Sequence, residues 1–73
     1  MSIFDLNDAL QRATGPRTWI CWRGVYGEGD FVDDEAMLCN SKGHVVLGRA
    51  SDGLDALLAR MPEAASELAE TTS

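Results

Sequence analysis

Apolar residues recur at helical spacing at the start of the chain, with polar residues between them. The stripe consists of Ile3, Leu6, Leu10 and Ala13. Ser2 is a good N-cap, and the pair Gly15-Pro16 ends a helix because glycine tolerates the left-handed cap and proline cannot continue the hydrogen-bond ladder. The pattern predicts a helix over about residues 3–13.

Residues 18–26 are dense in aromatic and β-branched side chains, which is typical of a β-strand. Side chains alternate between the two faces of a strand, so Trp19 and Trp22 point in opposite directions. In a chain this short, one of the two faces is expected to present an aromatic residue to a partner.

The segments 36–39 and 44–49 are apolar and flank a four-residue loop, 40–43, that ends in glycine. This pattern predicts a β-hairpin. Residues 27–30 form a turn by composition, and an acidic loop is expected between this turn and residue 36. Because the connections are too short for a crossover helix, we expect a sheet of three antiparallel strands.

A second apolar stripe with helical spacing follows Ser51-Asp52, whose side chains are expected to act as N-caps. Its members are Leu54, Leu57, Leu58 and Met61. Pro62 interrupts the pattern, so this helix ends near Arg60 or a second short helix begins at the proline. The segment 63–70 has few apolar residues and is expected to be a loosely docked helical tail.

The predicted class is therefore α+β, with an N-terminal helix, a three-stranded antiparallel sheet and a C-terminal helix broken at Pro62 (α-β-β-β-α). Residues 1–70 are expected to form a single small domain, and residues 71–73 a disordered tail. A length of 73 residues excludes a multidomain enzyme.

Twelve acidic residues stand against six basic ones, for a net charge of −6. This balance argues against direct binding of nucleic acid, which requires Lys and Arg to neutralise phosphates. No apolar run approaches the roughly 18 residues that span a bilayer, and two cysteines are too few for a secreted disulfide scaffold. A cytoplasmic protein without membrane contact is expected.

The acidic side chains form two clusters. The first contains Glu28, Asp30, Asp33, Asp34 and Glu35, and the second contains Glu63, Glu67 and Glu70. Alternate residues of an extended segment lie about 6.6 Å apart, and neighbours along a helix face about 6 Å apart, which resembles the spacing of consecutive phosphates. The clusters either mimic nucleic acid toward a basic groove, with Trp22 and Tyr26 as anchors, or simply solvate a loop and a tail.

Other chemistry is poorly supported by the spacing of the candidate ligands. The acidic stretch lacks the ligand order of a calcium loop, and Cys21, Cys39 and His44 lack the paired cysteines of a zinc site. The glycines at 24, 27 and 29 lack the lysine of a phosphate-binding loop. We expect no metal, no cofactor and no catalytic activity.

The small size, the net charge and the acidic stretches 28–35 and 63–70 resemble the small phage-encoded inhibitors, among them anti-CRISPR proteins. The resemblance is one of general character and carries over no individual residue. It implies a non-enzymatic inhibitor whose acidic surface blocks the nucleic-acid-binding groove of a basic defence complex, in the bacterial host cytoplasm if the protein is phage-encoded.

Two other functions stay open. A domain of this size has an undersized core, so the chain could be a structural or regulatory subunit that forms a homodimer through its sheet. Alternatively, Cys39 and His44 flank the predicted hairpin loop and could act as a thiol and its base in a small enzyme.

Overall fold

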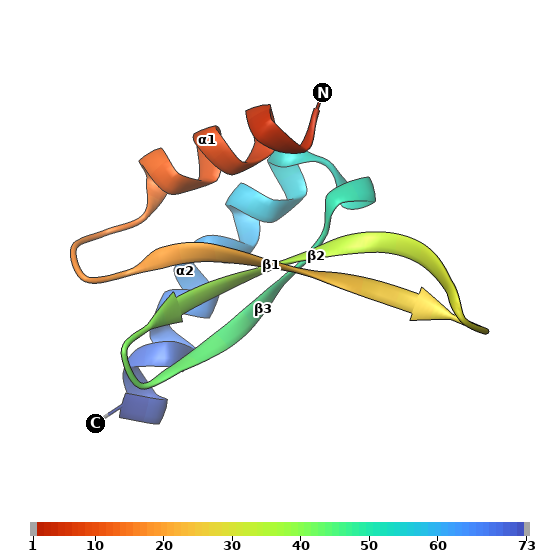
Figure 1. Cartoon of the computed structure of the whole chain (residues 1–73). Coiled ribbons are helices and arrows are strands. Elements are labelled where there is room, and N and C mark those ends of the chain that lie inside the picture. The colour runs from red at the N-terminus through yellow and green to blue at the C-terminus, as the bar shows by residue number, and fades with distance from the viewer. Residues whose placement is uncertain (1, 73) are drawn as a thin grey trace.

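The structure, a computed structural model, describes the backbone of residues 2–72 and the side chains of residues 2–70. In chain order the elements are α1 (Ile3–Ala13), β1 (Trp19–Gly27), β2 (Asp30–Asn40), β3 (Gly43–Arg49), the short 3-10 helix η1 (Ala50–Asp52) and α2 (Leu54–Thr72) (Figure 1). This order confirms the predicted α+β class and the α-β-β-β-α arrangement. Of the predicted tail, residues 71 and 72 belong to α2, and Ser73 lies outside the described residues.

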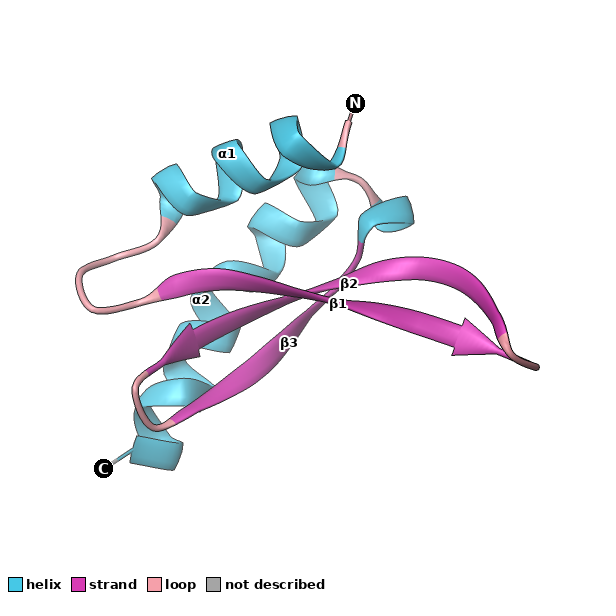
Figure 2. Ribbon diagram, viewed as in Figure 1, coloured by secondary structure: helices cyan, strands magenta, loops and turns pink. Residues whose placement is uncertain are grey.

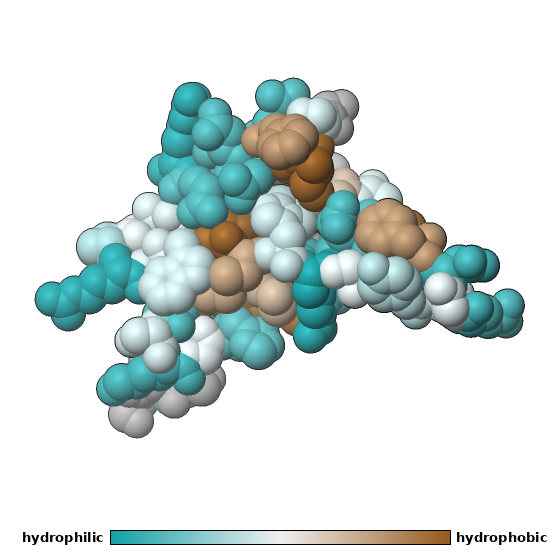
Figure 3. Space-filling view, viewed as in Figure 1, coloured by the Kyte–Doolittle hydropathy of each residue, from teal (hydrophilic) through white to brown (hydrophobic). Residues whose placement is uncertain are grey.

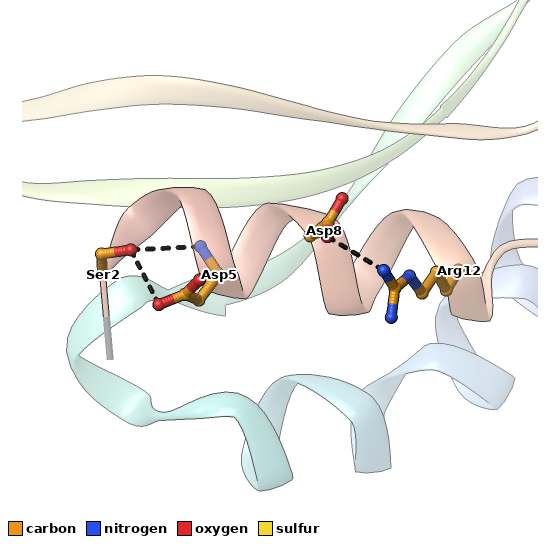
Figure 4. A network of polar contacts seen from close by, with 4 residues as sticks. All are labelled: Ser2, Asp5, Asp8 and Arg12. Carbon is orange, nitrogen blue, oxygen red and sulfur yellow. Dashed lines mark hydrogen bonds and ion pairs between the residues drawn. The ribbon is translucent and has the colours of Figure 1, made fainter.

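Helix α1 begins and ends at the predicted residues. The Ser2 hydroxyl accepts a hydrogen bond from the Asp5 amide at 3.2 Å and donates one to the Asp5 carboxylate at 3.0 Å. Further along the helix, the guanidinium of Arg12 lies 3.2 Å from the carboxylate of Asp8 (Figure 4). The Thr14 hydroxyl donates to a backbone carbonyl of the last turn at 2.7 Å. These bonds join residues close in sequence, so the sequence alone is enough to predict where the helix begins and ends.

The three strands form one antiparallel sheet in the order β1-β2-β3, with β2 in the centre. In the turn between β2 and β3, the Asn40 side-chain oxygen accepts hydrogen bonds from the amides of Lys42 at 2.8 Å and Gly43 at 3.0 Å. The side chain thus stabilises the turn. The hairpin predicted over 36–49 is confirmed, but the predicted four-residue loop is wrong: Asn40 and Gly43 pair with each other at the strand ends, so only Ser41 and Lys42 form the turn.

The predicted acidic loop is wrong, because residues 30–35 form the first half of β2. Glu28 and Gly29 have φ angles of 54° and 87°, so both occupy the left-handed region, as in the primed two-residue turns that fit the twist of a hairpin. With only these two residues in the turn, pairing with β1 starts directly at Asp30. The resulting β1–β2 hairpin extends away from the helices, on the right of Figure 1.

Helix α2 runs without interruption through Pro62, so the predicted break at this residue is wrong. Proline removes one intrahelical hydrogen bond, the one to the carbonyl of Leu58, but its own side chain is exposed. Buried residues lie on both sides of the proline along one helix face: Leu57, Met61, Ala64 and Leu68. Packing of both halves against the same core keeps the helix continuous. Since Ala64 and Leu68 are buried, the prediction of a loosely docked segment is also wrong.

Ser51 and Asp52 lie in η1 and do not cap α2 as predicted. The Asp52 carboxylate accepts a hydrogen bond from the Arg49 amide at 2.9 Å, which caps the short helix. Gly53, with φ of 91°, reverses the chain direction, and its carbonyl accepts the 3.2 Å hydrogen bond from the Leu57 amide in the first turn of α2.

Both helices pack on one face of the sheet, so the molecule has two layers with one core between them. In Figure 2, α2 passes behind the sheet and α1 runs along its β1 side. The core contains Leu6, Leu10, Ile20, Ala36, Leu38, Leu47, Leu57, Met61, Ala64 and Leu68. The opposite face of the sheet is not covered by either helix.

Candidate functional site

The predicted acidic surface is divided by the geometry of β2. Asp33 and Glu35 point to the uncovered face of the sheet, whereas Asp34 points to the other face, because side chains alternate along a strand. Glu28 and Asp30 lie at the turn of the hairpin, away from both. The five carboxylates therefore do not form one row of charge.

Asp33 is bound within the molecule. Its carboxylate accepts hydrogen bonds from the Ser51 hydroxyl at 2.5 Å, the Ser51 amide at 3.3 Å and the Asp34 amide at 2.8 Å. The hydrogen bond from the Ser51 hydroxyl has the largest effect on the pKa of Asp33 and lowers it below its ordinary value. Desolvation opposes this shift, whereas the two backbone hydrogen bonds and the nearby charge of Arg49 add to it. Asp33 thus fastens η1 to β2, and its carboxylate is engaged in hydrogen bonds within the molecule.

Glu35 lies between two arginines of the neighbouring strands. It is opposite Arg23 of β1 and opposite Arg49 of β3 in the register of the sheet. The Arg23 side chain donates to Glu35 at 2.6 Å from Nε and contacts it at 2.5 Å from a terminal nitrogen. The negative charge of Glu35 is therefore compensated by this chain's own arginines.

The second acidic cluster is compensated in part. Arg60 of α2 lies 3.4 Å from Glu63 and 2.8 Å from Glu67, so one cation serves two carboxylates on the same helix face. Glu70 lies exposed near the end of the described side chains. The predicted row of three glutamates is thus a local ion-pair network over most of its length.

Trp22, a predicted anchor, has an internal role. Its indole Nε1 donates to the Asn7 side-chain oxygen at 2.9 Å, and the ring packs against the core. Gln11 also donates to this oxygen at 3.3 Å and makes two bonds to the backbone of Ile20, donating to its carbonyl at 3.0 Å and accepting from its amide at 3.2 Å. Helix α1 therefore closes this part of the β1 edge, and Trp22 is half-buried between α1 and the core.

Three of the five large hydrophobic side chains that lie exposed among the described residues are grouped in the hairpin tip, defined here as Tyr26, Phe31 and Val32. Their exposed fractions are 68%, 56% and 55%. Tyr26 is opposite Phe31 in the register, with the ring centroids 5.9 Å apart in an edge-to-face arrangement. Figure 3 shows apolar side chains on this projecting arm, next to polar ones.

A register shift between the strands and the lack of a side chain at Gly24 determine how the side chains of the hairpin tip are arranged. The register shifts between Val25 and Tyr26, so Val32 is an extra residue in β2 with no partner in β1. Gly24 leaves room for the Tyr26 ring, since a Cβ at Gly24 would lie 3.0 Å from the ring. Sequence reasoning found Tyr26 but missed Phe31 and Val32. The sequence could have indicated these two residues, because an apolar pair between a glycine-containing turn and acidic residues is not expected to be part of the core.

The uncovered sheet face is apolar near its centre. Trp19 of β1 is 41% exposed and lies opposite Cys39, and Cys21 lies opposite Met37, whose other neighbour is Val46 of β3. Trp19 also donates from its indole nitrogen to the Cys21 sulfur at 3.1 Å. Trp19, and not Trp22, is thus the tryptophan that the fold leaves facing outward.

The geometry gives little support to the thiol chemistry. Cys39 is opposite His44, as expected from the hairpin, but burial and then a hydrogen bond with Cys21 raise the pKa of Cys39 to about 11. A protonated thiol is a poor nucleophile. Within residues 2–70, no group of three or more His, Cys, Asp and Glu side chains is arranged to hold a metal ion.

Comparison with known proteins found no matching family model, no matching curated protein and no matching solved structure. Among the described residues, no helix combines the length and the apolar character needed to cross a membrane.

Proposed function

We propose that this chain acts without catalysis, by binding another protein through the hairpin tip. The observation that supports this proposal is the exposure of Tyr26, Phe31 and Val32 at the end of an arm that extends beyond the core. These side chains do not belong to the core cluster, so folding alone does not account for their apolar character. Aromatic residues grouped at one point are typical of the centres of protein interfaces.

The charges beside the tip indicate the kind of partner. Glu28 and Asp30 are exposed in and beside the turn. An apolar centre with an acidic rim fits an apolar pocket with a basic rim, such as the edge of a nucleic-acid-binding groove. Inhibition of a nucleic-acid-binding complex is therefore retained as a proposal, with the hairpin tip as the anchor in place of an extended acidic decoy.

A crosslinking experiment tests the contact in cells that naturally contain the protein. A photoreactive phenylalanine analogue at position 31 is expected to give adducts with one partner protein, whereas the same analogue at the exposed position Ser66 of α2 is expected to give none. The double variant Tyr26→Ser/Phe31→Ser should weaken binding of the captured partner by about 2 kcal/mol or more, roughly thirtyfold in Kd.

The matched control is Phe4→Ser. Phe4 is a phenyl group of even greater exposure, at 80%, but it lies on α1. All variants should keep the circular dichroism spectrum of the parent, since none removes a core residue. Equal loss of binding in Phe4→Ser and in the double variant would contradict an anchor at the tip.

The uncovered sheet face favours a second candidate function, a subunit that forms a homodimer through its sheet. Its apolar centre around Trp19, Cys21 and Met37 is the specific observation. Sedimentation at micromolar concentration distinguishes the two candidates. A dimer that dissociates in the variant Trp19→Lys but not in Tyr26→Ser/Phe31→Ser would favour the subunit, and a monomer would leave the hairpin tip as the proposed surface.

A further inference from the structure

A pocket of about 290 Å³ lies at the opposite end of the sheet from the hairpin tip. Its walls come from three segments that are distant in sequence: the α1–β1 loop, the β2–β3 turn and the second half of α2. On the left of Figure 1, these three segments converge. The lining residues are Pro16, Arg17, Thr18, Asn40, Ser41, Lys42, Ala65, Leu68 and Ala69. This volume is near the lower limit of small-molecule sites.

The basic side chains of this protein differ in whether an acidic side chain lies near them. Four of the six basic residues have acidic neighbours: Arg12 with Asp8, Arg23 with Glu35, Arg60 with Glu63 and Glu67, and Arg49 opposite Glu35. Arg17, Lys42 and Arg49 form no ion pair with any described side chain, but Arg49 has the carboxylates of Glu35 and Asp33 nearby, whereas Arg17 and Lys42 both line the pocket. In a protein of net charge −6, two uncompensated cations at one pocket make it a local site of positive potential.

The backbone at Arg17 supports a role for its side chain. Arg17 has a φ of 65°, in the left-handed region that favours glycine. The turn is held by the Thr18 hydroxyl, which donates to the Gly15 carbonyl at 2.9 Å. An arginine at this position therefore imposes strain that a glycine would not, and strained residues of this kind cluster at functional sites, while Glu28 has a similar φ within the β1–β2 turn.

The chemistry of the lining defines the ligand. The cations and the hydroxyl of Ser41 lie beside apolar surface from Ala65 and Ala69. We propose that this pocket binds a small organic oxyanion, a carboxylate or a phosphate monoester carried on a short apolar group. The guanidinium of Arg17 pairs with the oxyanion through two parallel hydrogen bonds, Lys42 adds a second charge, and the apolar group lies against α2.

A structural role for the cations is the alternative. The C-terminal turn of α2 borders the pocket and carries partial negative charge, which Arg17 and Lys42 would also complement. The two roles predict opposite effects of Arg17→Gly. If the side chain serves a ligand, the variant relieves backbone strain and raises the melting temperature. If it stabilises the helix end, the variant lowers the melting temperature.

The test is a titration of the full chain, followed by the chemical shifts of backbone amides, with phenyl phosphate and benzoate as probes. Each probe is expected to shift amides in residues 15–18, 40–42 and 65–69. Benzyl alcohol, which has the ring without the charge, and inorganic phosphate, which has the charge without the ring, are expected to bind more weakly. Shifts spread over the whole surface, or inorganic phosphate binding as tightly as phenyl phosphate, would overturn the proposal.

Variants complete the test. Arg17→Gly is expected to weaken binding of the charged probes about tenfold or more while raising the melting temperature, because it removes charge-assisted hydrogen bonds. Lys42→Gln should weaken binding less, and the control Arg12→Gln should leave it within about twofold, because Arg12 lies on α1 and pairs with Asp8. Unchanged binding in Arg17→Gly, or a lower melting temperature, would refute the assignment. The variant Tyr26→Ser/Phe31→Ser should retain probe binding, so this result is independent of the proposed protein contact.

Discussion

Pro62 lies inside a continuous helix, and its replacement by alanine should stabilise the protein. Proline in a helix interior is about 3 kcal/mol less favourable than alanine, because it removes the hydrogen bond to the carbonyl of Leu58 and its ring crowds that carbonyl. Part of this cost is offset in the native protein, since proline also restricts the unfolded chain by about 1 kcal/mol. Pro62 is exposed, so little packing is lost. The net expectation for Pro62→Ala is a gain of about 2 kcal/mol in the free energy of unfolding.

Chemical and thermal denaturation measure this gain. For a domain of this length, about 2 kcal/mol raises the melting temperature by about 10 °C. The matched control is Ser66→Ala, another exposed site on α2, which reports the helix propensity of alanine alone and should give less than about 1 kcal/mol. If Pro62→Ala gained no more than the control, the proline would not lie in the interior of a continuous helix, and the reasoning would be wrong.

Three further predictions concern packing and protonation. Leu68→Ala should lower the free energy of unfolding by about 3 kcal/mol in urea denaturation, because this side chain is only 2% exposed, whereas a loosely docked helix end would show almost no change. The pKa of Asp33 is lowered in the folded state. The ionised Asp33 carboxylate therefore contributes to stability above pH 3.8, the ordinary pKa of the group, and this contribution is lost as the pH falls through the lowered pKa. Asp33→Asn should flatten the acid side of a plot of the free energy of unfolding against pH. The pKa of Cys39 is raised from 9.0 to about 11, so the protonated thiol contributes to stability below pH 9 and this contribution is lost as the pH rises toward 11. Cys39→Ala should remove this decline in stability at alkaline pH. Iodoacetamide should label Cys39 slowly near neutral pH, because the thiol is protonated there.

The parts of the fold that could be predicted from the sequence are those determined by neighbours along the chain. The predicted bounds of helix α1 are correct at both ends, because the N-cap Ser2 directly precedes the helix and Gly15-Pro16 follows shortly after its end. The β2–β3 hairpin is predicted correctly, apart from the length of its turn, because two apolar segments flank a short polar stretch in which Asn40 binds the amides two and three residues later. In both cases, one short window of sequence contains all the groups that decide the structure.

The errors arose where distant contacts override local preference. The acidic first half of β2 is unfavourable for a strand by composition, but the tight turn at Glu28 and Gly29 leads it directly into pairing with β1. Pro62 is unfavourable in a helix, yet buried residues on both sides of it contact one core. No local pattern carries this information, because the compensating contacts come from other elements.

The candidate site shows the same limit for electrostatics. The number of carboxylates in a segment does not determine its potential, because the compensating arginines are remote in sequence and adjacent only in the sheet. Arg23 lies 12 residues before Glu35 and binds it directly, and Arg49 flanks the same residue from β3. The charges without an ion pair are therefore found only after pairing is known, and they include the exposed carboxylates beside the apolar hairpin tip at one end of the sheet and Arg17 with Lys42 at the other. Since the two members of an ion pair cancel most of each other's field within a Debye length, the total charge of −6 does not by itself locate the surfaces of strong potential, and the arrangement of the unpaired charges does.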